Sequence, residues 1–252
     1  MITRRLQLWA LALIGALLAI APPALAADVQ VAVAANFTEP AKEIAAAFKA
    51  KTGNTATLSF GSSGQFYAQM AHGAPYEVFL SADADRPKAA ERDGLGVPGT
   101  RFTYAVGRLV LYSKTAGLVD GAGAVLKGGG FDKLAIADPA AAPYGAAAVQ
   151  TMKKLGVYNG VKRKIVMGVS ITQAYQFVDS GAAPLGFVAL SQVIKVQGGS
   201  RWLVPKEDHA PITQQAILLF PGDKNPVARS FLEFLKSPEA LAIIKRYGYE
   251  LP

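Results

Sequence analysis

The sequence contains no cysteine, and this absence excludes disulfide bonds, thiolate metal sites and cysteine nucleophiles. Histidine is nearly absent as well, because His72 and His209 are the only two, and both stand in stretches that are typical of exposed loops. Asp83 and Asp85 are close enough in sequence to share a metal ion, but no acidic residue with EF-hand spacing follows them. We therefore interpret Asp83 as a helix cap, and the chain offers little material for acid–base or metal catalysis.

Long runs of charged or apolar residues are missing from most of the chain. The formal net charge is +8, yet the lysines and arginines are scattered, and no basic run is interleaved with aromatic residues as in nucleic-acid binders. After residue 26, no segment approaches the roughly 20 consecutive apolar residues that a membrane-spanning helix needs. We expect no nucleic-acid partner and no direct insertion of the mature chain into a membrane.

The first 26 residues have the composition of a secretory signal peptide. Arg4 and Arg5 provide a basic start, residues 6–20 an apolar run, and residues 24–26 (ALA) a small-residue cleavage signal. We predict that residues 1–26 are a signal peptide and that the chain from residue 27 onward is exported. An exported protein without disulfides fits a bacterial periplasm or cell surface.

The rest of the chain repeats one local pattern, an apolar strand that turns directly into a helix. Apolar residues alternate over residues 29–33, as in a buried strand. Asn36 and Thr38 are typical N-cap residues, and Pro40 suits a first helical turn. Further strands are expected at residues 55–60, 76–81, 134–137, 164–169 and 184–190. Strands that alternate with helices predict the α/β class, with parallel sheets flanked by helices.

A glycine inside one apolar run suggests that this α/β chain is divided into two lobes. Gly107 stands within residues 104–113, where it weakens a simple strand and suits a bend toward another lobe. Later strands look like a return to the first sheet. We predict a monomer of two lobes with a hinge and a cleft between them: residues 27–106 with 205–252 form lobe 1, and residues 107–204 form lobe 2.

The turns that follow the strands collect the candidate binding residues. Ligands of open α/β sheets bind beyond the carboxyl ends of parallel strands. Here those turns carry hydroxyls, an amide, glycines and small apolar residues, with almost no lysine or arginine, at residues 36–37, 61–64, 81–83, 143–145, 170–173 and 186–189. Four of the turns open helices, two in each lobe, and a helix is expected over residues 146–155 after one of them. Their N–H groups suit a fully ionised tetrahedral oxyanion and disfavour protonated phosphate, whose O–H would lack an acceptor.

Two functions of other kinds remain open on the residues alone. An exported serine hydrolase would use Ser63, but residues 61–64 (GSSG) lack the G-x-S-x-G elbow, and no histidine lies in the turns to activate a serine. A structural or adhesive module would bind no small anion.

Six collinear segments, in order along the mature chain, carry a family resemblance: residues 34–37 (AANF), 60–63 (FGSS), 73–83 (GAPYEVFLSAD), 137–139 (ADP), 183–186 (APLG) and 245–249 (KRYGY). Together they resemble the periplasmic molybdate-binding proteins of bacterial ABC importers. The resemblance implies a two-lobed, type II periplasmic-binding fold that closes over molybdate or tungstate and delivers it to a membrane permease. It implies no enzymatic activity and no cofactor, and it leaves a sulfate or other tetrahedral oxyanion receptor as the alternative.

The resemblance also implies which residues contact the ligand. The ligand contacts of the family fall on Asn36, Ser63, Tyr144 and Ile171, with Phe37 and Ser62 as neighbours beside them. The same residues form a metal site if the ligand is described as molybdenum. Many relatives have a serine where Asn36 stands, and an amide could donate from its NH₂ group instead. Some relatives have a tyrosine hydroxyl where Ala189 stands, so that contact is either missing or supplied by Tyr144.

Overall fold

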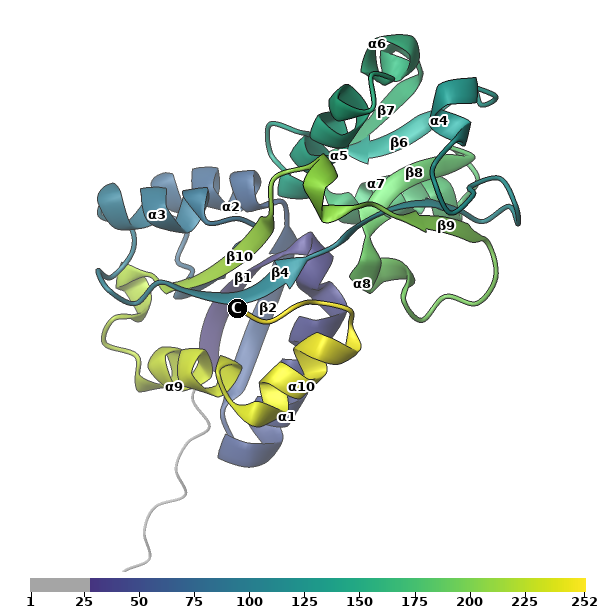
Figure 1. Cartoon of the computed structure of the whole chain (residues 1–252). Coiled ribbons are helices and arrows are strands. Elements are labelled where there is room, and N and C mark those ends of the chain that lie inside the picture. The colour runs from purple at the N-terminus through teal and green to yellow at the C-terminus, as the bar shows by residue number, and fades with distance from the viewer. Residues whose placement is uncertain (1–27) are drawn as a thin grey trace, which may run out of the picture.

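The computed structural model describes residues 28–252, so the predicted signal peptide at residues 1–26 lies outside the described residues. The described chain forms two five-stranded sheets, each flanked by helices, which lie side by side (Figure 1). The α/β, two-lobed fold class predicted from the alternation of strands and helices is thus confirmed. None of the helices within residues 28–252 is both long and apolar enough to cross a membrane.

The first lobe is built on a sheet of order β2-β1-β3-β10-β4. Its strands are β1 (Asp28–Ala34), β2 (Thr55–Gly61), β3 (Val78–Leu80), β4 (Phe102–Gly107) and β10 (Ile212–Leu218). β1 pairs in parallel with β2 and β3, whereas β10 is antiparallel to β3 and β4. Because the register pairs Ala34 with Gly61 and Val33 with Leu80, the three parallel strands end at one edge of the sheet.

Helices cover both faces of this first sheet. Alternate residues of β1 point to opposite faces, so Val29, Val31 and Val33 enter one core and Ala32 enters the other. The valine side is closed by α1 (Thr38–Thr52), α9 (Pro226–Leu235) and α10 (Pro238–Arg246). The alanine side is closed by α2 (Ser63–Ala71), with α3 (Asp85–Arg92) packed beside it (Figure 1). Burial on both faces explains why β1 is apolar almost throughout.

The second lobe repeats this layering on a sheet of order β7-β6-β8-β5-β9. Its strands are β5 (Leu109–Ser113), β6 (Leu134–Ala137), β7 (Ile165–Gly168), β8 (Leu185–Ala189) and β9 (Ser200–Leu203). Its helices are α4 (Val125–Gly128), α5 (Pro143–Lys154), α6 (Tyr158–Val161), α7 (Ile171–Asp179) and α8 (Leu190–Val193). Leu109 and Leu111 of β5 face the core under α5, while Val110 and Tyr112 face Val178 of α7 on the other side. Short 3-10 turns complete the chain: η1 (Ala35–Phe37), η2 (Lys162–Lys164), η3 (Lys206–Asp208) and η4 (Phe220–Gly222).

The chain passes between the sheets after β4 and again between β9 and β10. The bend expected at Gly107 is confirmed, since β4 ends at Gly107 and β5 begins at Leu109 in the other sheet. A side chain could not be accommodated there. A Cβ at Gly107 would overlap the Tyr144 hydroxyl and lie 2.7 Å from Nε2 of Gln214. The crossing therefore depends on the close approach that only glycine allows.

Two helix starts differ from expectation. Helix α1 begins at Thr38 after the turn η1 and has no side-chain cap, so the prediction that Asn36 and Thr38 cap it was wrong. The Asn36 side chain is drawn into buried hydrogen bonds instead, and the Thr38 hydroxyl donates to the carbonyl of Ala35 at 2.8 Å. Helix α5 begins at Pro143, earlier than the expected residue 146, because the fixed φ of proline suits the first helical position.

Glu250 connects the two segments that join the lobes. Its backbone pairs with Val106 of β4, with N···O distances of 2.8 and 3.0 Å. Its carboxylate lies 2.6 Å from Nζ of Lys206, on the second crossing, and 3.0 Å from Nη1 of Arg108, on the first. The hydrogen bond from Lys206, and then that from Arg108, lowers the pKa of the Glu250 carboxyl below its ordinary value. One carboxylate thus holds both crossings together.

We expect Glu250→Gln to lower the melting temperature slightly at neutral pH. A carboxyl whose pKa is depressed by folding stabilises the fold fully above its unfolded pKa and loses that contribution as the pH falls through its folded pKa. Because the side chain is 40% exposed, solvent screening limits the difference to about 1 kcal/mol or less. Thermal unfolding of both proteins from about pH 7 to about pH 3 should therefore show a gap that closes at acid pH. Glu233→Gln, in a more exposed pair with Lys236, is the matched control; a Glu250 gap that persists at the acid end would contradict this assignment.

Candidate functional site

A small pocket lies between the lobes at the edge where the parallel strands end. Its cavity volume is about 10 Å³, far below the ~300–1,000 Å³ of sites for drug-sized ligands. Its lining comes from both lobes: Ala34, Ala35, Asn36, Ser62, Ser63, Ala82, Ala142, Pro143, Tyr144 and Ile171. Five of the six residues expected at the site, Asn36, Ser62, Ser63, Tyr144 and Ile171, are therefore brought together around one cavity.

Phe37, the sixth candidate, lies in the core of the first lobe. It is fully buried and packs edge-to-face against Tyr104 and Tyr249, with ring centroids 4.9 and 5.3 Å away. In the turn η1 it lies next to Asn36 in sequence, but its side chain points away from the pocket lining. Its contribution is to fix the conformation of that turn.

Four helical segments start at the pocket. Ala35 and Asn36 belong to η1, which leads into α1, and Ser63 opens α2; both come from the first lobe. Tyr144 and Ile171 lie in the first turns of α5 and α7 in the second lobe. The first N–H groups of a helix have no acceptor within the helix, and the helix dipole makes that end positive. Since Pro143 has no N–H, Tyr144 provides the first backbone donor of α5.

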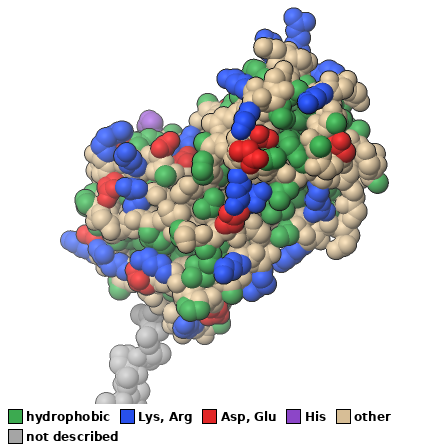
Figure 2. All heavy atoms as spheres, in the orientation of Figure 1, with side chains coloured by type: hydrophobic (Ala, Val, Ile, Leu, Met, Phe, Trp, Pro, Cys, Tyr) green, Lys and Arg blue, Asp and Glu red, His purple; other side chains and the backbone are tan. Residues whose placement is uncertain are grey.

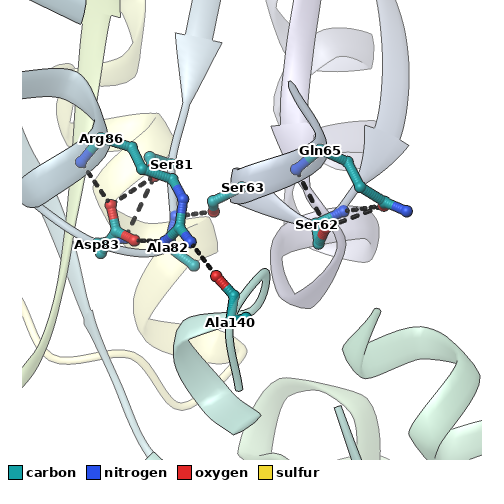
Figure 3. A network of polar contacts seen from close by, with 8 residues as sticks. All are labelled: Ser62, Ser63, Gln65, Ser81, Ala82, Asp83, Arg86 and Ala140. Carbon is teal, nitrogen blue, oxygen red and sulfur yellow. Dashed lines mark hydrogen bonds and ion pairs between the residues drawn. The ribbon is translucent and has the colours of Figure 1, made fainter. Parts of the chain in front are cut away.

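The two adjacent serines have different roles. The Ser62 hydroxyl is 2.9 Å from Oε1 of Gln65 and completes a capping box at the start of α2 (Figure 3). The Ser63 hydroxyl accepts the N–H of Ala82 at 2.9 Å, and the residue is 1% exposed (Figure 3). This bond uses one acceptor site of the Ser63 hydroxyl, and its proton is still available to donate. Of the pair, Ser63 is the one that can bind a ligand through its side chain.

Asn36 does not present its NH₂ group to the pocket. Its Nδ2 donates to Oε1 of Gln214 at 2.9 Å and to the Tyr249 hydroxyl at 3.0 Å, so both amide hydrogens are used within the protein. The interpretation that the amide replaces a serine hydroxyl as a ligand donor is therefore wrong for this conformation. The backbone N–H of Asn36, in the first turn of η1, has no acceptor within that turn and is the candidate donor of this lining residue.

Behind the pocket, Gln214 organises a buried polar network that joins the lobes. It is fully buried, and its Oε1 also accepts from the Tyr104 hydroxyl at 3.0 Å. Its Nε2 donates to the hydroxyl of Tyr144, in the second lobe, at 3.3 Å. Ser191 of α8 donates to the carbonyl of Asn36 at 2.8 Å. Sequence reasoning missed Gln214 and Ser191, since Tyr144 lies 70 residues from Gln214, Asn36 lies 155 residues from Ser191, and no local pattern marks either residue.

Burial keeps the tyrosines of this network protonated. It raises the pKa of Tyr249 to about 12 and that of Tyr104 and Tyr144 well above the ordinary value. All three therefore remain neutral hydroxyls at physiological pH.

No charged side chain lines the pocket among the residues that the structure describes. On the face drawn in Figure 2, lysines and arginines are interspersed with acidic residues over the outer surface of both lobes. Arg86 lies nearby, but its guanidinium pairs with Asp83 (Figure 3). Asp83 also accepts the N–H of Arg86 at 3.0 Å, but the N-cap position of α3 is Ala84, so Asp83 supports the helix start from one residue before the cap and not from the cap position that was predicted for it.

The remaining candidates for catalysis lie away from the pocket. His72 is exposed at the end of α2, as expected, whereas His209 is half-buried, with Nε2 enclosed and unpaired. Within residues 28–252, no group of three or more histidine, aspartate and glutamate side chains is placed to hold a metal ion. Ala189, at the end of β8, is buried in the core of the second lobe and does not line the pocket.

Comparison with known proteins gives consistent results from sequence and structure. Residues 29–250 match the family model of the bacterial extracellular solute-binding proteins. The molybdate-binding protein ModA of Rhodobacter capsulatus is 57% identical over 247 residues, which cover 98% of this chain and 96% of that protein. ModA of Azotobacter vinelandii is 54% identical over 229 residues, which cover 90% and 91%. The resemblance recognised in the sequence motifs is thereby confirmed.

Solved structures extend this result. The periplasmic molybdate-binding protein of Azotobacter vinelandii aligns with a TM-score of 0.86 and 43% identity, over 89% of this chain and 99% of that one. The sulfate-binding protein SubI of Mycobacterium tuberculosis aligns with a TM-score of 0.75 at 13% identity, over 89% and 87%, which is a likeness of fold alone. The family model spans almost all of the described chain, and two relatives are identical to it at more than half of the aligned residues. This protein therefore belongs to the bacterial extracellular solute-binding proteins.

Proposed function

We propose that this protein captures molybdate, and also tungstate, between its two lobes and delivers it to the membrane permease of an ABC importer. The observation that carries the proposal is a small pocket without a charged lining residue, on which four helix starts from both lobes converge. The names of the relatives of 57% and 54% identity support molybdate as the ligand.

A dianion can be held in such a pocket by dipoles alone. Removing an ion from water is costly unless hydrogen bonds replace its hydration, and charge-assisted bonds from N–H and O–H groups are the strong ones. We assign the backbone N–H groups of Asn36, Tyr144 and Ile171, and the hydroxyl of Ser63, as ligand donors. Ser62 supports this set by capping α2, and Phe37 by fixing η1.

The donors also select a protonation state. Each donor group on the pocket requires an acceptor on the ligand, and molybdate and tungstate dianions present oxygens that only accept. Phosphate retains an acidic proton near neutral pH, and that O–H would be left without a partner at a cost of about 1–3 kcal/mol. Sulfate satisfies the same donors, so a sulfate receptor is the second candidate, distinguished from the first by the size of the ion.

The transport cycle follows from the architecture. Residues 27–106 with 205–252 would move as one lobe and residues 107–204 as the other, hinged near Gly107 and Glu250. A ligand that contacts both lobes shifts the equilibrium toward the closed form, so a permease can distinguish loaded from empty protein by its shape. The protein would act as a periplasmic monomer after removal of residues 1–26. We expect no cofactor and no catalysed reaction, since the relatives of 57% and 54% identity are named as molybdate-binding proteins.

Calorimetric titration with molybdate, tungstate, sulfate and phosphate in parallel tests the proposal. We expect tight binding of molybdate and tungstate, weaker binding of sulfate, and binding of phosphate about 10- to 100-fold weaker than that of molybdate, because phosphate leaves a buried O–H unpaired. Equal affinity for phosphate, or no heat with any of the four anions, would refute the assigned ligand class.

Ser63→Ala should weaken molybdate binding roughly 10- to 100-fold, since it removes a ligand donor and leaves the Ala82 N–H without its acceptor. Ser62→Ala is the matched control: losing a helix cap costs about 1 kcal/mol of stability but removes no ligand donor. Calorimetry and thermal unfolding of both variants separate the two effects. Should Ser62→Ala lose as much affinity as Ser63→Ala, the division of roles between these serines is wrong.

The affinity for molybdate should be constant between about pH 7 and about pH 9. No lysine, histidine or carboxylate lines the pocket, and the raised pKa of Tyr144 and Tyr249 keeps both hydroxyls protonated over this range. Titrations at several pH values and fixed ionic strength measure this directly. A dissociation constant that rises severalfold across this pH range would mean that a titrating protein group binds the ligand, which would contradict the assigned donors.

A further inference from the structure

Arg86 joins the lobes beside the pocket without lining it. Its Nη1 pairs with Asp83 within the first lobe, and its Nη2 donates to the carbonyl of Ala140 at 2.8 Å (Figure 3). Ala140 belongs to the loop of the second lobe that leads into α5. One arm of the guanidinium is thus balanced by a carboxylate of its own lobe, while the other crosses to the opposite lobe.

Gly64 makes a second bond across the same boundary. Its N–H, in the first turn of α2, donates to the carbonyl of Ala141 at 2.9 Å. A Cβ at Gly64 would lie 2.9 Å from the Cα of Ala141 and 3.0 Å from Nη2 of Arg86. The lobes therefore approach each other so closely at this point that only glycine fits at position 64.

Each half of this contact is ordered within its own lobe. In the first lobe, Oδ1 of Asp83 accepts the N–H of Arg86 at 3.0 Å, which fixes the start of α3. In the second lobe, Asp138 holds the loop, because Oδ1 accepts the N–H of Ala140 at 2.9 Å and its carbonyl accepts that of Ala142 at 2.8 Å. Two preformed surfaces lose little entropy when they meet, so their hydrogen bonds contribute to closure.

Both halves are also adjacent in sequence to ligand donors. Ala82, next to Asp83, donates its N–H to Ser63, and Ser63 precedes Gly64. Residues 140–142 lead directly to Pro143 and Tyr144 at the start of α5. A change in the contact between lobes is therefore coupled to the position of the donors.

We propose that Gly64, Arg86, Ala140 and Ala141 form a closure seam, which is a contact between the lobes. The seam slows the escape of bound ligand, although no side chain of the seam touches the ligand. Arg86 is a positioning residue of this seam, and Gly64 is required for its close approach. This inference rests on the proposed function, since it concerns the release of molybdate.

Arg86→Ala should release molybdate roughly tenfold faster with little change in the association rate, because the bond to Ala140 joins the two lobes and must break before they separate. Release can be followed by rapid filtration of labelled molybdate after an excess of unlabelled molybdate is added. The increase should persist at high salt, since a hydrogen bond to a carbonyl involves no second charge that salt could screen. Arg92→Ala, which removes the same charge from an exposed position of the same helix, is the control and should release molybdate at the wild-type rate.

Gly64→Ala tests the seam independently of charge. The new methyl group would hold the lobes apart and weaken molybdate binding roughly tenfold or more, while the melting temperature without molybdate stays unchanged or rises, because alanine favours a helix over glycine. Gly160→Ala, at a helical position with open space around it, is the control for the added methyl group.

The outcomes separate this inference from the proposed function. Faster release in Arg86→Ala and weaker binding in Gly64→Ala, with both controls unaffected, support the seam. Two results would refute the seam while leaving the proposed function intact, provided that the wild-type protein binds molybdate. In the first, Arg86→Ala releases molybdate at the wild-type rate. In the second, Arg86→Ala only lowers the association rate of molybdate, and high salt abolishes that difference. Failure of the wild-type protein to bind molybdate would instead refute the function.

Discussion

An ion that leaves water must recover its hydrogen bonds, and the pocket between the lobes is organised by this requirement. Its donors are uncharged and come from helix starts, at which N–H groups are unpaired by the geometry of the helix itself. Neither lobe holds enough of them alone. Asn36 and Ser63 belong to the first lobe, and Tyr144 and Ile171 to the second. In the function proposed above, binding and lobe closure would therefore be one event, and this coupling is what a transport protein of two states needs.

The network behind the pocket determines how the two halves are aligned. Gln214 contacts Asn36 with its oxygen and Tyr144 with its nitrogen, so one buried amide spans both lobes. A buried polar group without a partner is costly, and a fully satisfied network therefore favours a single arrangement of its members. Gly107 belongs to the same arrangement, because any side chain there would displace Tyr144 and Gln214. The hinge and the floor of the pocket are thus packed against one another.

The fold alone does not identify the ligand. The sulfate-binding protein of Mycobacterium tuberculosis has a similar fold at 13% identity, and proteins of one fold commonly bind different ligands. The information specific to this chain lies in the lining: small residues, one free serine hydroxyl and backbone N–H groups, with the nearby arginine paired to Asp83. In the proposed function, such a lining would distinguish ions by size and by protonation state.

The sequence by itself determined the class of fold, the bend at Gly107 and the turns on which the pocket residues lie. These features depend on local rules, since alternation, helix spacing and the restrictions of glycine and proline act over a few residues.

The sequence could not determine in which direction each side chain points. Asn36 has the composition of a cap or a ligand donor, yet the tertiary structure commits its amide to Gln214 and Tyr249, whose positions follow from strand pairing across the whole chain. Phe37 and Asn36 are neighbours in sequence, but one side chain enters the core and the other enters the network, because the turn η1 points successive residues to different sides. The contact of Arg86 with Ala140 was equally beyond the sequence, because it exists only where two separately folded lobes meet.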